Sequence, residues 1–181
     1  MKVLFVVPPL TGHVNPTVAV ATELQKRGHQ TAWVAHPRAV IPLLPPDSTV
    51  FPLDDRVPDE LLETTAANAN KVRGLQAFKF LWEDFLLPLA RASQTGVADA
   101  IDRYQPDLVV VDQQALAGAL VCRQRTTPWA MFATTSAGVT NPLAGLPKVR
   151  IWLDEQLAQL QRDSGVEPVE HPDRSPHCNI V

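Results

Sequence analysis

Short apolar runs alternate with longer amphipathic stretches along this chain, and that alternation restricts it to few folds. Lys2–Val7 (KVLFVV) is a continuous apolar run, which is typical of a strand buried on both faces of a parallel sheet. Similar runs follow at Thr31–Ala35, Thr49–Leu53, Asp107–Val111 and Trp129–Ala133. The alternation predicts βαβ units, and therefore an α/β fold with a Rossmann-like, doubly wound parallel sheet in a three-layer sandwich. Because a domain averages about 150 residues, we expect a single domain over residues 1–181.

Helices are predicted between these strands. The first should start at Asn15-Pro16, since Asn is favoured as an N-cap and Pro at the first helical position, and it should stop at Gly28. Apolar residues recur at threes and fours over Leu75–Leu89, which predicts a buried helix face that Pro88 should kink or break. Further helices are expected at Arg38–Leu44, Val97–Tyr104, Leu116–Arg125 and Val149–Arg162.

Composition excludes several classes of protein. An apolar fraction of 45% excludes intrinsic disorder, and a net charge of −3 has the wrong sign for binding a nucleic acid backbone. The apolar run at the start is far shorter than the roughly 20 residues of a membrane span, so we expect neither a signal peptide nor stable membrane insertion. Two cysteines, Cys122 and Cys178, cannot form a disulfide framework, which indicates a reducing compartment and a cytoplasmic location.

One histidine and one aspartate are expected to meet beyond the sheet. Doubly wound sheets bind ligands at the carboxyl ends of the strands, where the strand order reverses. In the common order 3-2-1-4-5, strands one and four are neighbours at that point. His13 follows the first strand and Asp112 ends the fourth, although 99 positions separate them. Such a pair is suited to deprotonate a hydroxyl group, because the carboxylate fixes the ring tautomer and stabilises the cation that forms. Alternatively, His13 only satisfies loop backbone groups and Asp112 caps the next helix.

Cofactor and metal sites are not expected. The loop after the first strand contains a single glycine, Gly12, so it has neither a G-x-G-x-x-G fingerprint nor a P-loop, and nicotinamide or flavin binding is not predicted. The histidines, aspartate and cysteine near the C-terminus have no usual zinc spacing, so no metal is expected there; they are His171, Asp173, His177 and Cys178.

Two other functions stay open on the residues alone. A hydrolase could use Ser136 with His13 and Asp112, although the G-x-S-x-G elbow is missing and a turn or cap is the more common role of such a serine. A non-catalytic, flavodoxin-like binding module is the third possibility. It predicts that the His13 ring and the Asp112 carboxylate lie apart or point away from any pocket.

Several segments together resemble one enzyme family. Leu10–Pro16 (LTGHVNP), followed by E-L-x-x-R-G-H at Glu23–His29, resembles the amino-terminal signature of the UDP-glycosyltransferases of GT-B fold. Bacterial macrolide, antibiotic and carotenoid glycosyltransferases carry this pattern. Pro106–Asp112 (PDLVVVD) and Phe132–Gly138 (FATTSAG) are similar to the family's fourth strand and to the stretch after its fifth. The resemblance covers essentially the whole chain, but only the first of the family's two domains.

The resemblance implies a role for each matching residue. His13 would be the general base and Asp112 its orienting partner in an inverting sugar transfer from a UDP- or dTDP-sugar to a hydroxyl of a hydrophobic small molecule. Thr11 and Gly12 would lie near the sugar and phosphates. The acceptor pocket would be lined by residues near Trp82 and after the fifth strand, namely Trp82, Phe85, Thr134, Thr135 and Ser136.

The resemblance also implies what this chain lacks. Relatives carry a second, C-terminal domain that makes most of the contacts with the nucleotide sugar, and its signature is absent here. We therefore expect residues 1–181 to be an acceptor-binding N-terminal domain that turns over poorly or not at all alone. A companion chain or the missing domain would complete the site, with the nucleotide sugar as co-substrate and no separate cofactor.

Overall fold

The computed structural model describes residues 1–53, 61–63, 67–68, 71–135 and 143–169. Its centre is a five-stranded, all-parallel sheet in the order β3-β2-β1-β4-β5. This confirms the predicted α/β class and the predicted reversal of strand order between β1 and β4. Every strand lies within one residue of its predicted bounds: β1 Lys2–Val6, β2 Gln30–Ala35, β3 Thr49–Pro52, β4 Leu108–Asp112 and β5 Trp129–Phe132.

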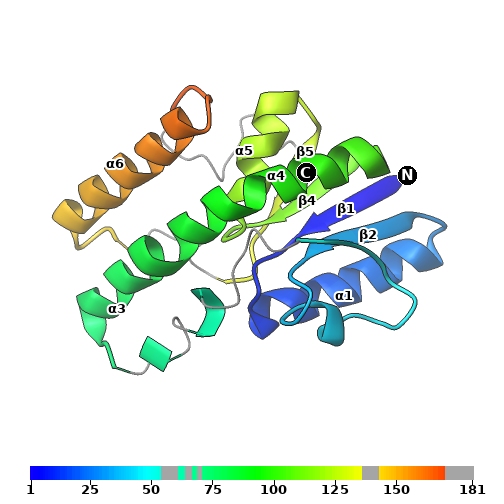
Figure 1. Cartoon of the computed structure of the whole chain (residues 1–181), viewed down its shortest axis with the longest axis horizontal. Helices are drawn as coiled ribbons and strands as arrows, with labels where there is room; N and C mark the ends of the chain where they lie inside the picture. Colours follow the sequence, from blue (N-terminus) through cyan, green and yellow to red (C-terminus); the bar gives the residue numbers. More distant parts are fainter. Residues whose placement is uncertain (54–60, 64–66, 69–70, 136–142, 170–181) are drawn as a thin grey trace.

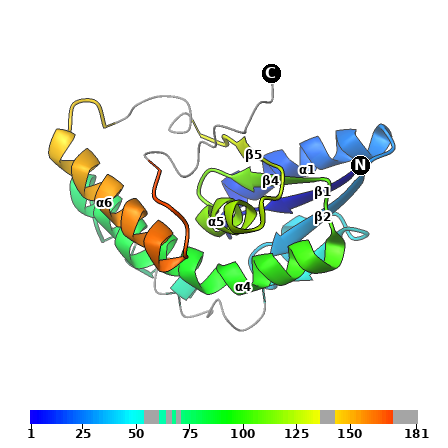
Figure 2. The same ribbon diagram turned by 90° about the horizontal axis from the view of Figure 1, so that it is seen from above.

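Helices cover both faces of the sheet, as Figures 1 and 2 show. On one face, α1 (Thr11–Lys26) packs on the side chains of Val3, Phe5 and Trp33. On the other, α4 (Leu87–Tyr104) and α5 (Leu116–Arg125) pack on alternate residues of the same strands, such as Leu4 and Val6. Because successive strand residues point to opposite faces, both sets are buried, as the continuous apolar runs predict.

The first helix begins at Thr11, so the predicted start at Asn15-Pro16 is wrong. Its first turn is closed by the Leu10 carbonyl, which accepts the N–H groups of His13 at 2.9 Å and Val14 at 3.1 Å. The buried face of α1 also begins at this turn, before the proline. Pro16 therefore lies inside the helix, where it costs one backbone hydrogen bond without ending it. In consequence, His13 belongs to the first turn of a helix and not to a loop.

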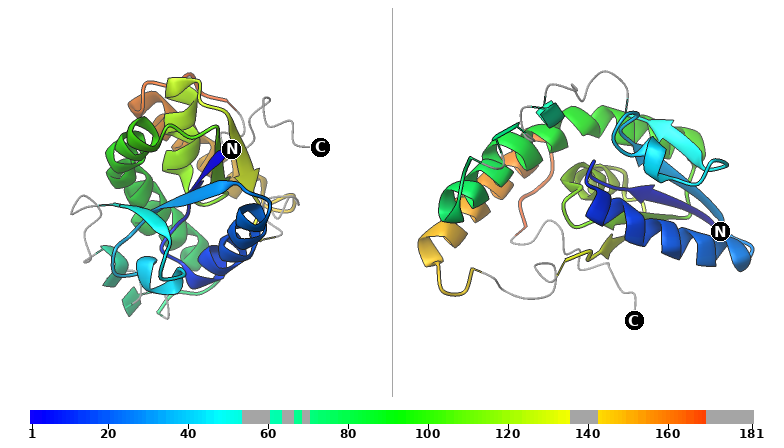
Figure 3. Two further views of the ribbon diagram at one scale, coloured as in Figure 1. Left: turned by 90° about the vertical axis from the view of Figure 1, so that its right-hand side faces the viewer. Right: turned by 90° about the horizontal axis from the view of Figure 1, so that it is seen from below.

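A single helical segment runs from residue 74 to residue 104. It consists of α3 (Gly74–Phe80), the π-helical η2 (Leu81–Leu86) and α4. Of the predicted kink or break at Pro88, the break is therefore wrong, and the helix predicted at Val97–Tyr104 is the second half of α4. Pro88 follows directly after η2. The wider turn absorbs the proline, whose ring would otherwise press on the carbonyl four residues earlier. The segment curves past the sheet, and α3 extends beyond the carboxyl ends of the strands (Figure 3).

The last described helix, α6 (Pro147–Asp163), packs against α4 and α5 through its C-terminal half. Leu160 is buried with Leu87 of α4 and Leu120 of α5. The side chain of Arg123 in α5 donates to the Gln161 side-chain carbonyl at 2.6 Å, which adds a polar contact to this packing. The N-terminal half of α6 reaches past the sheet to the same side as α3 (Figure 2). A short 3-10 turn, η1 (Ile41–Leu43), lies within the predicted segment Arg38–Leu44.

Candidate functional site

The side chains of His13 and Asp112 are in contact. The ring nitrogen Nδ1 lies 2.9 Å from Oδ1 and 3.0 Å from Oδ2 of the carboxylate. Asp112 is the last residue of β4, and β4 pairs with β1, the strand that leads to His13. Asp112 is only 1% exposed and His13 only 8%. The strand order thus brings together two residues that are 99 positions apart, so the first of the two arrangements expected for a non-catalytic module, that they lie apart, is wrong.

A third side chain, that of Thr134, completes the contact. Its hydroxyl group donates to Asp112 Oδ2 at 2.7 Å, and the same oxygen lies 2.7 Å from His13 Nδ1. We call His13, Asp112 and Thr134 the His13 cluster. The other carboxylate oxygen, Oδ1, accepts the backbone N–H of Gln114 at 2.8 Å. Asp112 thus binds a turn residue two positions before α5 begins, and is not the cap of that helix.

The packing of α1 on the sheet fixes the position of the His13 backbone. Val14 and Thr17 are both fully buried. The Thr17 hydroxyl donates to the Val14 carbonyl at 2.7 Å, and the indole N–H of Trp33 in β2 donates to the Thr17 oxygen at 3.3 Å. The first turn of α1 therefore has little freedom to move relative to the sheet.

The arrangement leaves one ring nitrogen of His13 for chemistry. Within the described ranges, the ring makes its polar contacts through Nδ1. A carboxylate facing Nδ1 favours the tautomer with the proton on that nitrogen, which gives Nε2 the lone pair. Chemically, such a ring can accept a proton at Nε2, while Asp112 stabilises the imidazolium that results.

The other predicted site residues after β5 fall in different places. Thr135 is exposed, and its hydroxyl oxygen accepts a hydrogen bond from the side-chain amide of Gln113. Ser136 lies outside the described residues, so the structure does not place it. Thr134 faces the same ring nitrogen as Asp112, whereas a hydrolase nucleophile and its aspartate face opposite nitrogens.

The residues predicted to lie near the donor sugar are exposed, whereas the aromatic residues predicted to line the acceptor pocket are buried or half-buried. Thr11 and Gly12 are exposed in the first turn of α1. Phe85 is 2% exposed and belongs to the core between the sheet and α4. Trp82 is half-buried, with its ring centroid 6.2 Å from that of Phe78. Sequence spacing alone cannot tell core aromatics from pocket aromatics, because both recur at helical intervals.

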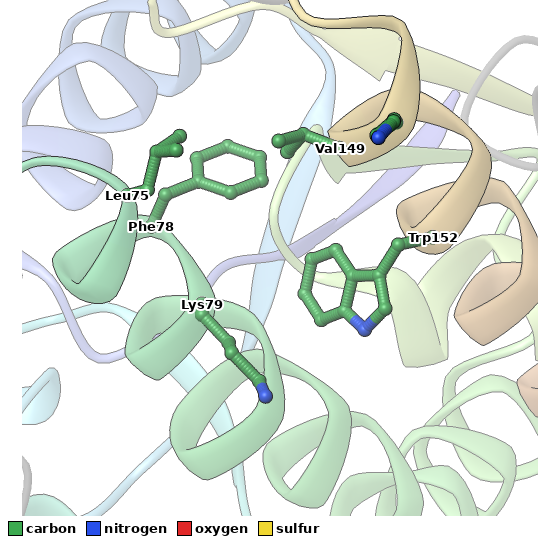
Figure 4. A pocket seen from close by; sticks show the side chains of 6 residues that line it. Leu75, Phe78, Lys79, Val149 and Trp152 are labelled. Carbon is green, nitrogen blue, oxygen red and sulfur yellow. The ribbon is translucent and has the colours of Figure 1, made fainter.

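A pocket of about 230 Å³ lies between α3 and α6. We call it the α3–α6 pocket; its lining consists of Leu75, Phe78, Lys79, Lys148, Val149 and Trp152. Figure 4 shows the rings of Phe78 and Trp152 facing it from opposite helices. Their centroids are 6.4 Å apart and the ring planes make an angle of 65°. The sequence places these residues on two predicted helices, but carries no signal that the two helices meet.

The described part of the chain contains neither a side-chain cluster suited to a metal ion nor a helix suited to span a membrane. No group of three or more His, Cys, Asp or Glu side chains there is arranged to hold a metal ion. None of the helices in that part is both long and apolar enough to cross a membrane. The tail residues His171, Asp173, His177 and Cys178 lie outside it.

No protein-family model matches the sequence, and no curated protein matches it either. Solved structures do match. Spinosyn rhamnosyltransferase SpnG is 22% identical with a TM-score of 0.59, and the match covers 93% of this chain and 42% of SpnG. Glycosyltransferase SnogD from Streptomyces nogalater is 20% identical with a TM-score of 0.61, over 97% of this chain and 48% of SnogD.

A third match is glycosyltransferase VinC, solved in complex with dTDP; it is 19% identical, with a TM-score of 0.57, over 96% of this chain and 47% of VinC. The chain spans less than half the length of each of these three proteins. Likeness at this level of identity establishes the fold. It confirms the predicted class, one Rossmann-like half of the fold found in GT-B glycosyltransferases.

Proposed function

We propose that this chain carries the acceptor site and the general base of an inverting glycosyltransferase. The reaction would move a sugar from a nucleoside diphosphate donor to a hydroxyl group of a hydrophobic small molecule. The observation that carries the proposal is the 2.9 Å contact between His13 Nδ1 and Asp112, at the carboxyl edge of a sheet whose fold is shared with glycosyltransferases.

The geometry supports a specific sequence of bond changes. Nε2 of His13 takes the proton of the acceptor hydroxyl, and Asp112 stabilises the imidazolium through Nδ1–H. The oxygen freed of its proton attacks the anomeric carbon of the donor sugar. As the new carbon–oxygen bond forms, the bond from that carbon to the diphosphate breaks on the opposite side, and the nucleoside diphosphate leaves. In-line attack inverts the configuration at the anomeric carbon.

Thr11 and Gly12 are the residues of this chain that we place nearest to the donor. A methyl group added at Gly12 would meet no described atom within 4 Å, so internal packing does not account for the glycine there. An open, exposed first turn is compatible with close approach of a sugar diphosphate. VinC was solved with dTDP and SpnG with thymidine diphosphate, which supports a nucleoside diphosphate sugar such as a dTDP-sugar as donor.

Most contacts with the donor would come from elsewhere. Because this chain spans less than half of its structural neighbours, we propose that a second domain or a companion chain supplies them. The 181-residue chain alone would then bind an acceptor but transfer sugar poorly or not at all.

The α3–α6 pocket is the part of the acceptor site that the described residues form. Its lining is mainly apolar. Both α3 and the start of α6 lie beyond the carboxyl ends of the strands, the edge at which His13 and Asp112 meet (Figures 2 and 3). SpnG was solved with spinosyn aglycone, a precedent for acceptor binding in this fold. Thr135 and Ser136 stay proposed contacts of the acceptor, and Trp82 would support the pocket through Phe78.

A chimaera tests the proposal. This chain would replace the corresponding part of SnogD, and sugar transfer from UDP- and dTDP-sugars to phenolic and macrolide acceptors would be followed by mass spectrometry. We expect transfer, and a loss of about 10²–10⁴-fold in the His13→Ala chimaera, the usual contribution of a general base. His29→Ala is the matched control, since His29 lies in the turn after α1 and contacts the N-terminus. Equal rates for the His13→Ala and unaltered chimaeras would refute the proposal.

The chain alone provides the second arm of the test. Binding of the same acceptors, measured by tryptophan fluorescence, should be detectable without transfer of sugar. Efficient turnover by the 181-residue chain would contradict the need for a second half. Cleavage of an ester that depends on Ser136 would favour the hydrolase instead.

A further inference from the structure

We infer that Thr134 is a positioning residue that holds the His13–Asp112 pair in the base-competent tautomer. The inference rests on the proposed function only for its consequence in sugar transfer. The hydrogen-bond arrangement itself does not depend on which reaction the pair performs.

The number of protons available in the His13 cluster favours one arrangement of its hydrogen bonds. A hydroxyl group has one proton, and an ionised carboxylate has none. Thr134 gives its proton to Asp112 Oδ2 at 2.7 Å, so the lone pairs of its own oxygen remain for Nδ1, which is also 2.7 Å away. With a proton on Nδ1, the ring donates both to the carboxylate and to the Thr134 oxygen, and every polar atom of the contact has a partner.

The other tautomer is poorly accommodated. Without a proton, the Nδ1 lone pair would face carboxylate oxygens at 2.9 and 3.0 Å, an arrangement in which acceptors oppose acceptors. The threonine proton could turn to Nδ1, but Oδ2 would then lose its donor in a site where Asp112 is 1% exposed. Leaving a buried carboxylate oxygen unpaired is costly. Thr134 thus adds to the preference that Asp112 alone would impose.

The chain holds Thr134 from both sides. The pairing of β4 with β5 reaches Asp112 and Phe132, and the backbone N–H of Gln113 continues it with a bond to the Phe132 carbonyl at 3.1 Å. The side-chain amide of Gln113, which is 8% exposed, donates to the hydroxyl oxygen of Thr135. Phe132 and Thr135, on either side of Thr134, are therefore both hydrogen-bonded to Gln113, the residue after Asp112. This fixes the threonine hydroxyl over the carboxylate.

The tautomer can be measured directly by ¹⁵N NMR of the ring in the full chain, at about pH 8, where a free imidazole is neutral. We expect the unaltered chain to show a protonated Nδ1 with a low-field proton resonance, and Thr134→Ser, which keeps the hydroxyl, to show the same. Thr134→Val, which has the same shape without the hydroxyl, should lose that resonance and shift the Nδ1 signal towards that of an unprotonated nitrogen. The signals of His29 should stay unchanged in all variants.

Two further variants make the result decisive. Thr22→Val removes a hydroxyl from the exposed face of α1, where Thr22 bonds the Val18 carbonyl of its own helix, and should leave the His13 signals unaltered. Thr134→Ala repeats the test should the valine variant not fold, as judged by its thermal transition. The inference is overturned when a folded variant without the Thr134 hydroxyl keeps the signals of the unaltered chain. It is equally overturned when Thr134→Ser behaves like Thr134→Val.

Sugar transfer by the chimaera separates this inference from the proposed function. Thr134→Val should lower kcat with little change in KM, and Thr134→Ser should restore it. A changed tautomer in a protein that transfers no sugar would sustain the role of Thr134 and refute the glycosyltransferase. If sugar transfer depends on His13 but Thr134→Val leaves the tautomer unchanged, the glycosyltransferase proposal is supported and the role of Thr134 is refuted.

Discussion

The His13 cluster and the α3–α6 pocket are built in opposite ways. The cluster joins three polar side chains from α1, β4 and the segment after β5, at distances of 2.7 to 3.0 Å. The pocket is lined mainly by apolar side chains of two helices, together with Lys79 and Lys148, and one of the apolar residues, Leu75, is 55% exposed. Directional bonds demand fixed partners, whereas apolar contact demands only area and volume. We therefore expect substitutions in the cluster to change rate steeply, and substitutions in the pocket to change acceptor affinity gradually.

The largest expected effect is that of Asp112→Asn. The side-chain amide would present N–H groups to Nδ1, which favours the ring with its proton on Nε2 and so removes the base. In the serine-protease triad, the same exchange lowers kcat by about 10⁴-fold, so we expect a loss of about 10³–10⁴-fold in transfer by the chimaera. Acceptor affinity, measured by fluorescence titration, should stay within about twofold. A large loss of affinity would show that the two regions are not independent.

Gly118→Ala probes the packing beneath the cluster. A Cβ atom at Gly118 in α5 would lie 2.8 and 2.9 Å from the two methyl groups of Val111, the residue before Asp112. Overpacking of this kind costs about 1–3 kcal/mol, which urea unfolding would measure as a lower midpoint. Gly145→Ala is the control, since its Cβ would meet no described atom within 4 Å. Equal midpoints for the two variants would mean that α5 can move away from β4 at little cost.

Much of the cluster could be predicted because it depends on strand order. Continuous apolar runs mark buried strands, and in a doubly wound sheet the order places the ends of β1 and β4 side by side. The contact of His13 with Asp112 follows from that order. The sequence predicts Thr134 at the same edge, as a residue that contacts the acceptor molecule. Its hydrogen bond with Asp112 could not be predicted, because strand periodicity does not encode hydrogen bonds between side chains.

Local rules failed where tertiary packing overrides them. Asn15-Pro16 has the chemistry of a helix start, yet burial of Val14 and Thr17 on the sheet extends α1 to Thr11. Pro88 has the chemistry of a helix break, yet the π-helical η2 absorbs it. The α3–α6 pocket could not be predicted from the sequence for a related reason. It depends on how two helices meet, and each helix alone shows only an apolar stripe.

Trp152→Ala tests the pocket itself. Removing the indole takes away apolar area that a bound acceptor would cover, so we expect roughly tenfold weaker affinity, equivalent to about 1.4 kcal/mol. In the chimaera, KM should rise while kcat stays nearly constant. Ile151→Ala is the matched control: Ile151 is the neighbouring residue of α6, is 58% exposed and does not belong to the pocket lining. A fall in kcat without a rise in KM would place Trp152 with the chemistry and not with binding.

The smallest effect is expected from Asp102→Asn, at the end of α4 remote from the pocket. The Arg125 guanidinium, which donates to the Asp102 carboxylate at 3.0 Å, lowers the pKa of that carboxyl group. Its stabilising contribution is therefore present above the ordinary carboxyl range and disappears as the pH falls through the lowered pKa. The variant should unfold at slightly less urea at pH 7, and the difference should vanish in acid and in high salt, because the pair is exposed. Acceptor affinity should not change; weaker binding, as in Trp152→Ala, would show that the curved segment 74–104 transmits strain to the pocket.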